Sequence, residues 1–99
     1  MASFYRGLQR DVMEALRAPD VCRYLLANGW ERLDELPERV ASEITVFRRQ
    51  REGVLQEVIV PLNHRQREHY CRRMAELVSD LAGYEGRTTE EVVTRLANE

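Results

Sequence analysis

Two apolar runs rich in β-branched residues, joined by a short charged segment, constrain the fold of this chain most. Residues 41–63 read ASEITVFRRQREGVLQEVIVPLN. Each run alternates with a period of two, and Gly53 supplies the glycine typical of a hairpin turn. We therefore expect two antiparallel strands joined by a loop of three to five residues at about 50–53. Pro61, near the end of the second run, indicates an edge strand or the exit from a sheet.

Before the hairpin, the sequence predicts two helices and an irregular strand. Ser3 is the expected N-cap of the first helix, because apolar residues recur at helical spacing after it: Phe4, Tyr5, Leu8, Val12, Met13 and Leu16. Pro19 interrupts that pattern and suits the first turn of a second helix, from about Pro19 to Asn28, which Gly29 would end. Residues 30–36 are expected to form an irregular edge strand, and residues 37–39 a loop.

After the hairpin, two further helices are expected. Asn63 is the expected N-cap of the third helix, with Gln66 in the capping-box position, and Gly83 or Gly86 ends this helix. Its apolar stripe consists of Tyr70, Met74, Leu77, Val78 and Leu81. Thr88 and Glu91 form a capping box for the last helix, which runs to about Ala97 and buries Val92, Val93 and Leu96.

The predicted order α-α-β-β-β-α-α indicates an α+β fold with a small antiparallel sheet, made of the hairpin and an irregular third strand. The first three helices are expected to cover one face. The 99 residues, of which 43% are hydrophobic and 32% charged, are enough for one globular domain, 1–99. Apolar runs are too short to span a bilayer and no signal peptide is recognisable, so we expect a cytoplasmic protein.

The residues that could bind metal do not form a site in the sequence. Cys22 is remote from His64, His69 and Cys71, and residues two apart on a helix point in different directions. We therefore expect no metal and no cofactor, and two reduced, buried cysteines.

The two faces of the predicted hairpin carry different expectations. Ile44 and Val46 are expected to share the core face with Val58 and Val60. The opposite face still holds three large apolar residues, Phe47, Leu55 and Ile59. Either the first or last helix covers that face, or it is an interface with a second copy or another protein. The latter makes these three residues the predicted protein interface.

A basic middle segment suggests a different partner. Residues 48–73 hold seven Arg and three acidic residues, whereas the whole chain has a net charge of −2. Guanidinium groups bind phosphates, so RNA or DNA is the alternative partner. The candidate residues lie on the hairpin tip and at the start of the third helix: Arg48, Arg49, Arg51, Arg65 and Arg67.

Catalytic motifs are scarce. The sequence contains no glycine-rich phosphate loop, nucleophile elbow or HExxH motif, and His64, just after the second strand of the hairpin, is the remaining candidate for catalysis. A histidine beside arginines is more often a surface residue. We therefore predict no catalytic residues and no enzymatic activity.

One partial family resemblance concerns the segments LLANGW (25–30) and VIVPLNH (58–64). Their layout resembles that of HicA-type toxins, which are small proteins with a double-stranded-RNA-binding-like α-β-β-β-α fold. The resemblance implies a ribonuclease with a catalytic histidine on the second strand. Here that strand reads ITVFRR and contains no histidine. The sequence as a whole therefore favours a non-enzymatic interaction module or a subunit of a bacterial-type assembly, ahead of a nucleic-acid-binding protein and then a HicA-like ribonuclease.

Overall fold

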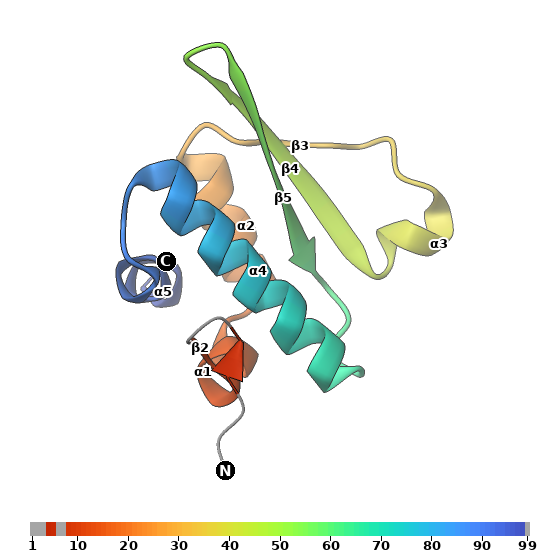
Figure 1. Cartoon of the computed structure of the whole chain (residues 1–99). Helices are drawn as coiled ribbons and strands as arrows, with labels where there is room; N and C mark the ends of the chain where they lie inside the picture. Colours follow the sequence, from red (N-terminus) through yellow and green to blue (C-terminus); the bar gives the residue numbers. More distant parts are fainter. Residues whose placement is uncertain (1–3, 6–7, 99) are drawn as a thin grey trace.

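The computed structural model describes residues 4–5 and 8–98 (Figure 1). A three-stranded antiparallel sheet, in the order β3-β4-β5, is flanked by helices, which confirms the predicted α+β class. The elements are β1 (Phe4–Tyr5), β2 (Leu8–Gln9), α1 (Arg10–Ala15), α2 (Ala18–Ala27), β3 (Glu31–Arg32), α3 (Glu38–Ala41), β4 (Ile44–Arg51), β5 (Val54–Pro61), α4 (Arg67–Glu85) and α5 (Thr89–Ala97).

The first helix is shorter than predicted. Ser3, its expected cap, lies outside the described residues, and the helix begins only at Arg10. The residues expected to form its first turns pair instead as the short antiparallel strands β1 and β2. Gly7 lies inside the predicted pattern, and glycine costs about 1 kcal/mol in a helix relative to alanine. Met13 and Leu16 are buried as expected.

The region between α2 and the hairpin differs from the prediction in one place. Helix α2 ends within one residue of its predicted end, and Gly29 after it has the left-handed φ of 85°. Strand β3 is confirmed but has only two residues. Pro37, expected in a loop, instead starts the short helix α3, and its carbonyl accepts hydrogen bonds from the N–H groups of Val40 and Ala41 at 2.9 Å. Proline suits this place because its fixed φ is compatible with a helix start.

The hairpin has a tighter turn than expected. Arg51 pairs with Val54, so the loop contains only Glu52 and Gly53, rather than three to five residues. Both loop residues have positive φ, 52° and 77°, as in a type I′ turn. The charged residues before the turn therefore continue strand β4 instead of forming the loop.

This turn also corrects the predicted strand faces. Residues directly opposite in an antiparallel pair share a face, and Phe47 lies opposite Val58 while Val46 lies opposite Ile59. The predicted grouping of Val46 with Val58 corresponds to a register shifted by one residue, which moves every side chain to the other face. Phe47 is 0% exposed and belongs to the core, so its assignment to a protein interface was wrong.

The helices form a layer against the Phe47 face of the sheet. Helices α2 and α4 contact β5, whereas α1 packs against α4, and α5 packs against α2 and α4 (Figure 1). The proposal that α1 or α5 covers the opposite face is therefore wrong, as is the expectation that α1 packs directly on the sheet beside α2 and α4. The stripe of α4 is buried as predicted, and the core includes Tyr70, Met74, Leu77, Val78, Leu81, Val92 and Leu96.

Of the capping signals predicted for the last two helices, the one at the start of α4 is wrong, whereas Gly86 and the capping box of α5 are confirmed. Helix α4 starts at Arg67, later than predicted, because Asn63 does not cap it. The Asn63 side chain instead accepts a hydrogen bond from the Arg65 backbone at 2.9 Å and donates one to the Glu43 carboxylate. Gly86, with φ 65°, ends α4, and the predicted capping box of Thr88 and Glu91 is present.

Candidate protein interface

The sheet face opposite Phe47, called the open face below, combines apolar and charged side chains. By the register of the hairpin it consists of Ile44, Val46, Arg48 and Gln50 on β4 with Leu55, Glu57, Ile59 and Pro61 on β5. Of the three residues predicted for a protein interface, Leu55 and Ile59 lie on this face and Phe47 does not. Val46 on the central strand is 7% exposed, Ile59 is half-buried and Leu55 is 56% exposed.

One ion pair divides the apolar side chains of the open face. Arg48 and Glu57 lie directly opposite each other, and an Arg48 guanidinium nitrogen is 3.0 Å from the Glu57 carboxylate. Both side chains are more than a third exposed, so the pair contributes little to stability. It does neutralise both charges locally. Leu55 and Ile59 are therefore separated by a charge-balanced position rather than by a free charge.

The outer edge of β5 has unpaired backbone groups. The Leu33 N–H donates to the Val46 carbonyl at 2.9 Å, so Val46 turns its backbone groups toward β3. Its partner Ile59 must then point its own N–H and C=O away from β4. Backbone groups alternate in direction along a strand, so those of Glu57 and Leu55, two and four residues earlier, also point away from β4. β5 is the last strand of the sheet, so these groups face outward.

The chain protects this edge only partly. Pro61 has no N–H and ends the strand, and the Tyr84 hydroxyl donates to the outward Glu57 carbonyl at 3.4 Å. Among the described residues, no backbone bond to the outward N–H groups of Leu55, Glu57 and Ile59 is formed. An edge strand of eight residues with exposed apolar side chains is a template for another strand.

The hairpin tip adds a second apolar contribution. It projects beyond β3 and the helices (Figure 1), and Val54, on the Phe47 face of the sheet, is 59% exposed. The sequence prediction did not include Val54 or Val46. The dipeptide Glu52-Gly53 was the available signal, because a two-residue loop would have fixed the register and placed both residues correctly.

The arginines predicted to bind nucleic acid are divided between two places. Arg48, Arg49 and Arg51 lie near the hairpin tip, whereas Arg65 and Arg67 lie near the start of α4 (Figure 1). β5 separates the two groups, and its eight residues span about 24 Å at the usual rise of a strand. The five arginines therefore do not form one continuous patch.

Three of these arginines are engaged within the chain. Arg48 pairs with Glu57, and Arg67 pairs with Glu14 at 2.8 Å. Hydrogen bonding and attraction to Arg67 hold the pKa of the Glu14 carboxyl below its ordinary value. The Arg49 guanidinium donates hydrogen bonds to the Gln56 side chain and lies over the Trp30 ring. Among the described residues, the side chains of Arg51 and Arg65 are the two of the five that form neither an ion pair nor a hydrogen bond.

His64 has a structural environment. Its ring stacks on the buried Tyr70 with 3.9 Å between centroids, and Tyr70 donates a hydrogen bond to the Leu16 carbonyl. The described part of the chain contains no group of three or more histidine, cysteine or acidic residues that could hold a metal ion. Cys22 and Cys71 are free and buried, as predicted, and burial raises the pKa of both thiols. Within the same residues, no helix is long and apolar enough to cross a membrane.

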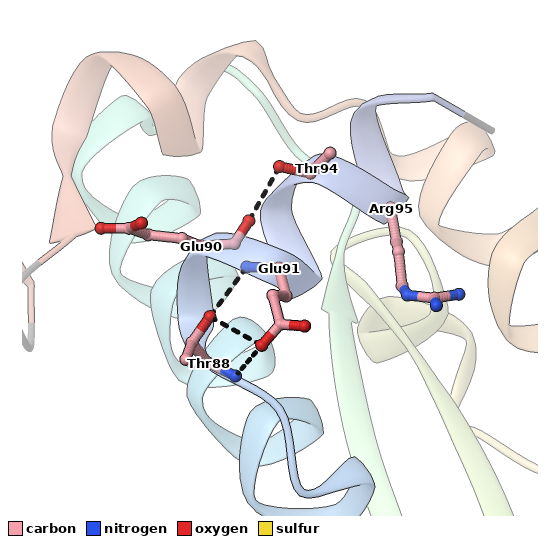
Figure 2. Close-up of a pocket in the computed structure, with 5 residues that line it drawn as sticks. All are labelled: Thr88, Glu90, Glu91, Thr94 and Arg95. Atoms are coloured by element: carbon pink, nitrogen blue, oxygen red, sulfur yellow. Dashed lines mark hydrogen bonds between the residues drawn. The ribbon is translucent and has the colours of Figure 1, made fainter.

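A shallow pocket on α5 is formed by capping groups (Figure 2). The Glu91 backbone N–H donates to the Thr88 hydroxyl at 3.1 Å, and the Glu91 carboxylate accepts from the Thr88 backbone at 3.1 Å. Thr94 donates its hydroxyl hydrogen to the Glu90 carbonyl at 3.0 Å. These bonds occupy the Thr88, Glu91 and Thr94 groups, so the Glu90 carboxylate and the Arg95 guanidinium are the main groups left for a ligand in this pocket.

A second pocket, of about 250 Å³, lies beside α3 at the base of the sheet. Its walls are mainly apolar and include Leu33, Leu36, Ile44 and Leu62. Its charged lining residues are Arg32 and Asp34, and no described histidine, cysteine or tyrosine lines it to act as a general acid or base beside them. The open face and the edge of β5 are therefore the strongest candidate site.

Comparison with known proteins adds no family to this description. No family model matches the chain, and no significant match was found among curated proteins or solved structures. Helix α2, the three sheet strands and α4 follow the order α-β-β-β-α, with α3 inserted. The resemblance to HicA-type toxins stays a prediction, and strand β4, which reads ITVFRRQR, contains no histidine.

Proposed function

We propose that this chain is a non-enzymatic protein-interaction module that binds a protein partner through the open face and the outer edge of β5. One observation carries the proposal: Leu55 and Ile59 present apolar side chains on the same strand whose outward backbone N–H groups are unpaired among the described residues. Such an edge binds an extended segment by backbone hydrogen bonds, while alternate side chains supply specificity. A subunit role in a larger assembly is consistent with this mode of binding.

The arrangement of the arginines favours this proposal over nucleic-acid binding. Phosphate recognition along a backbone needs several free cations on one surface. Here Arg51 and Arg65 lie at opposite ends of β5, and Arg48 and Arg67 are paired with carboxylates. An enzymatic role is the least supported, since neither His64 nor His69 lines the pocket on α5, the pocket beside α3 or the hollow at Arg48 and Leu55.

The proposal is tested by the effect of edge variants on binding to purified partners. Proteins that co-purify with the full chain are produced separately, and each is measured pairwise against the wild type, Ile59→Lys and Leu26→Lys. Leu26, on α2, is 53% exposed. Leu26→Lys is therefore the matched control, because like Ile59→Lys it replaces one apolar side chain by one positive charge. We expect at least tenfold weaker binding for Ile59→Lys and no change for Leu26→Lys. Equal binding by all three proteins would overturn the proposal.

A further inference from the structure

The partner of the open face can be named more closely, and this inference rests on the proposed function. We infer that the edge of β5 pairs with β5 of a second copy of this chain, antiparallel, about a twofold axis through Glu57. The two sheets would then join into one sheet of six strands. Three features of β5 support this partner. Its outward backbone groups are arranged symmetrically about Glu57, its apolar side chains would lie opposite one another across the twofold axis, and the charge of Glu57 is offset by Arg48.

The free backbone groups suit antiparallel self-pairing. Leu55, Glu57 and Ile59 all direct their N–H and C=O groups outward, so the unpaired positions are symmetric about Glu57. At every second position of an antiparallel ladder, two directly opposite residues exchange two N–H···O bonds, and residues with outward backbone groups occupy these positions. Leu55 would exchange two bonds with Ile59 of the second copy, and Ile59 two with Leu55. Glu57 would meet its own copy on the axis, once the Tyr84 hydroxyl leaves the Glu57 carbonyl.

The side chains match in the same register. On the open face, Leu55 lies opposite Ile59 of the second copy at two symmetric places, and cross-strand apolar pairs stabilise sheets. Within one copy, Ile59 already lies opposite Val46 on β4. The row of apolar side chains therefore continues from β4 of one copy, through Ile59, to Leu55 of the other. Leu55 is more exposed than Ile59, and this pairing would cover its side chain.

Glu57 decides between alternative registers. In the register centred on Glu57, two carboxylates face each other, and each has its own Arg48 at 3.0 Å to offset the repulsion. In a register centred on Gln56, Leu55 would face Glu57 of the second copy instead of Ile59. That register places an apolar side chain opposite a charge and loses both apolar pairs, so the axis through Glu57 is favoured.

The experiment is sedimentation equilibrium of the full chain over about 1 µM to about 500 µM, which spans the affinities of small transient interfaces. For the wild type, the mass should rise with concentration from 11.6 kDa towards twice that value. Ile59→Lys should weaken self-association at least tenfold, and Leu26→Lys, on α2, should leave it unchanged. Glu57→Gln should tighten it severalfold, since it removes the repulsion at the axis but keeps a hydrogen-bond acceptor for Arg48.

A backbone variant keeps the test independent of side-chain effects. The Leu55 N–H points away from β4, so Leu55→Pro removes an edge donor without removing a ladder bond of the hairpin. Circular dichroism confirms that the variant is folded, and Leu55→Pro should then weaken association as Ile59→Lys does. If Leu55→Pro unfolds the chain, the Ile59→Lys and Glu57→Gln results decide.

The outcomes separate this inference from the proposed function. A wild type that stays at 11.6 kDa at every concentration overturns self-pairing, while binding of another protein that Ile59→Lys weakens would still support the proposed function. Self-association that Ile59→Lys does not weaken overturns the assignment of the β5 edge. Weaker association of Glu57→Gln than of the wild type overturns the axis through Glu57.

Discussion

The guanidinium of Arg49 lies over the ring of Trp30, 4.6 Å from its centroid, and is also bound by polar groups. Its nitrogens donate to the Gln56 side chain at 2.8 Å and 3.1 Å, and to the Asn28 carbonyl at 3.3 Å. Three segments of the chain therefore meet at one side chain: the end of α2, and strands β4 and β5. This residue, counted in the sequence among candidates for phosphate binding, has a structural role.

The first prediction follows from these contacts. Arg49→Ala should lower the free energy of unfolding by about 1–2 kcal/mol, because it removes a cation–π contact and leaves Gln56, which is buried, without its donors. Arg51→Ala on the same hairpin is the matched control and should change stability by less than about 0.5 kcal/mol, as surface substitutions usually do. Urea denaturation measures both. Equal stability of the two variants would show that the Arg49 contacts contribute nothing.

Two buried tyrosines make the fold sensitive to alkaline pH. Burial, followed by its hydrogen bond to Glu85, raises the pKa of Tyr24 to about 12, and burial, followed by the nearby Cys71, raises that of Tyr70 to about 12. Both start from an ordinary value of 10.0, so between 10.0 and 12 the folded chain keeps protons that the unfolded chain loses. Their contribution to stability is full below pH 10.0 and decreases as the pH rises towards 12.

Unfolding measured at several pH values on both sides of 10.0 checks this second prediction. The free energy of unfolding should fall above that pH, and tyrosinate absorbance should rise together with loss of helical circular dichroism. Tyr24→Phe and Tyr70→Phe, compared with the wild type, should each make the fall less steep. Titration of all tyrosines near their ordinary pKa without unfolding would contradict the prediction.

At the scale of elements, the two-residue turn of the hairpin stores strain at one position. Glu52 is the only non-glycine residue among the described ones with positive φ, at 52°, and this conformation costs an L-residue roughly 1–2 kcal/mol. Asparagine tolerates it better and is the preferred residue before glycine in a type I′ turn. Glu52→Asn should therefore stabilise the fold by about 0.5–1 kcal/mol, which raises the melting temperature by about 2–6 °C.

Gly53 provides the control for this third prediction. Its φ is 77°, so Gly53→Ala should lower stability by about 1 kcal/mol, although a Cβ there would meet no other atom. Thermal denaturation of both variants measures the two effects. A lower melting temperature for Glu52→Asn than for the wild type would exclude strain at Glu52 as the explanation.

The same turn explains what the sequence could and could not predict. The capping box at Thr88, the stripe of α4 and the glycine after α2 were predictable because each depends on residues within a few positions. The faces of the hairpin depend on register, and register depends on whether Gln50 and Arg51 join the strand. Their own side chains do not decide this. The signal lies in the next two residues, Glu52-Gly53, because a two-residue loop pairs Arg51 with Val54 and Gln50 with Leu55. The error in register placed Phe47 at the surface.

For the candidate site, the sequence predicted the apolar side chains but not the free backbone edge of β5. Leu55 and Ile59 were predictable as apolar residues on the face opposite Val58. The free edge was not, because which strand lies at the border of the sheet is a property of the order β3-β4-β5. Pro61 gave the one local signal of an edge, and it lies at the end of the strand rather than beside Leu55.

On the scale of the whole molecule, the charge clusters of the sequence are dispersed. The segment 48–73 crosses from the hairpin tip along β5 to the start of α4, so neighbours in sequence lie at opposite ends of the sheet (Figure 1). Acidic residues from outside this segment also approach it, as Glu14 does at Arg67. A local excess of arginine thus becomes several separate positions, and Arg48, Arg67 and Arg73 among them are paired with carboxylates.

The fourth prediction is that this dispersal keeps binding to nucleic acid weak. Labelled single-stranded RNA and double-stranded DNA, titrated with the chain at about 50 mM salt, should show no saturable binding. The net charge is −2, and the two candidate arginines without a side-chain partner among the described residues, Arg51 and Arg65, lie far apart and would release few counterions together. The double variant Arg51→Ala with Arg65→Ala should behave like the wild type. Arg39→Ala with Arg95→Ala, two exposed arginines outside the segment, changes the net charge equally. Saturable binding that falls with salt, and that only the first double variant weakens, would instead establish the alternative partner.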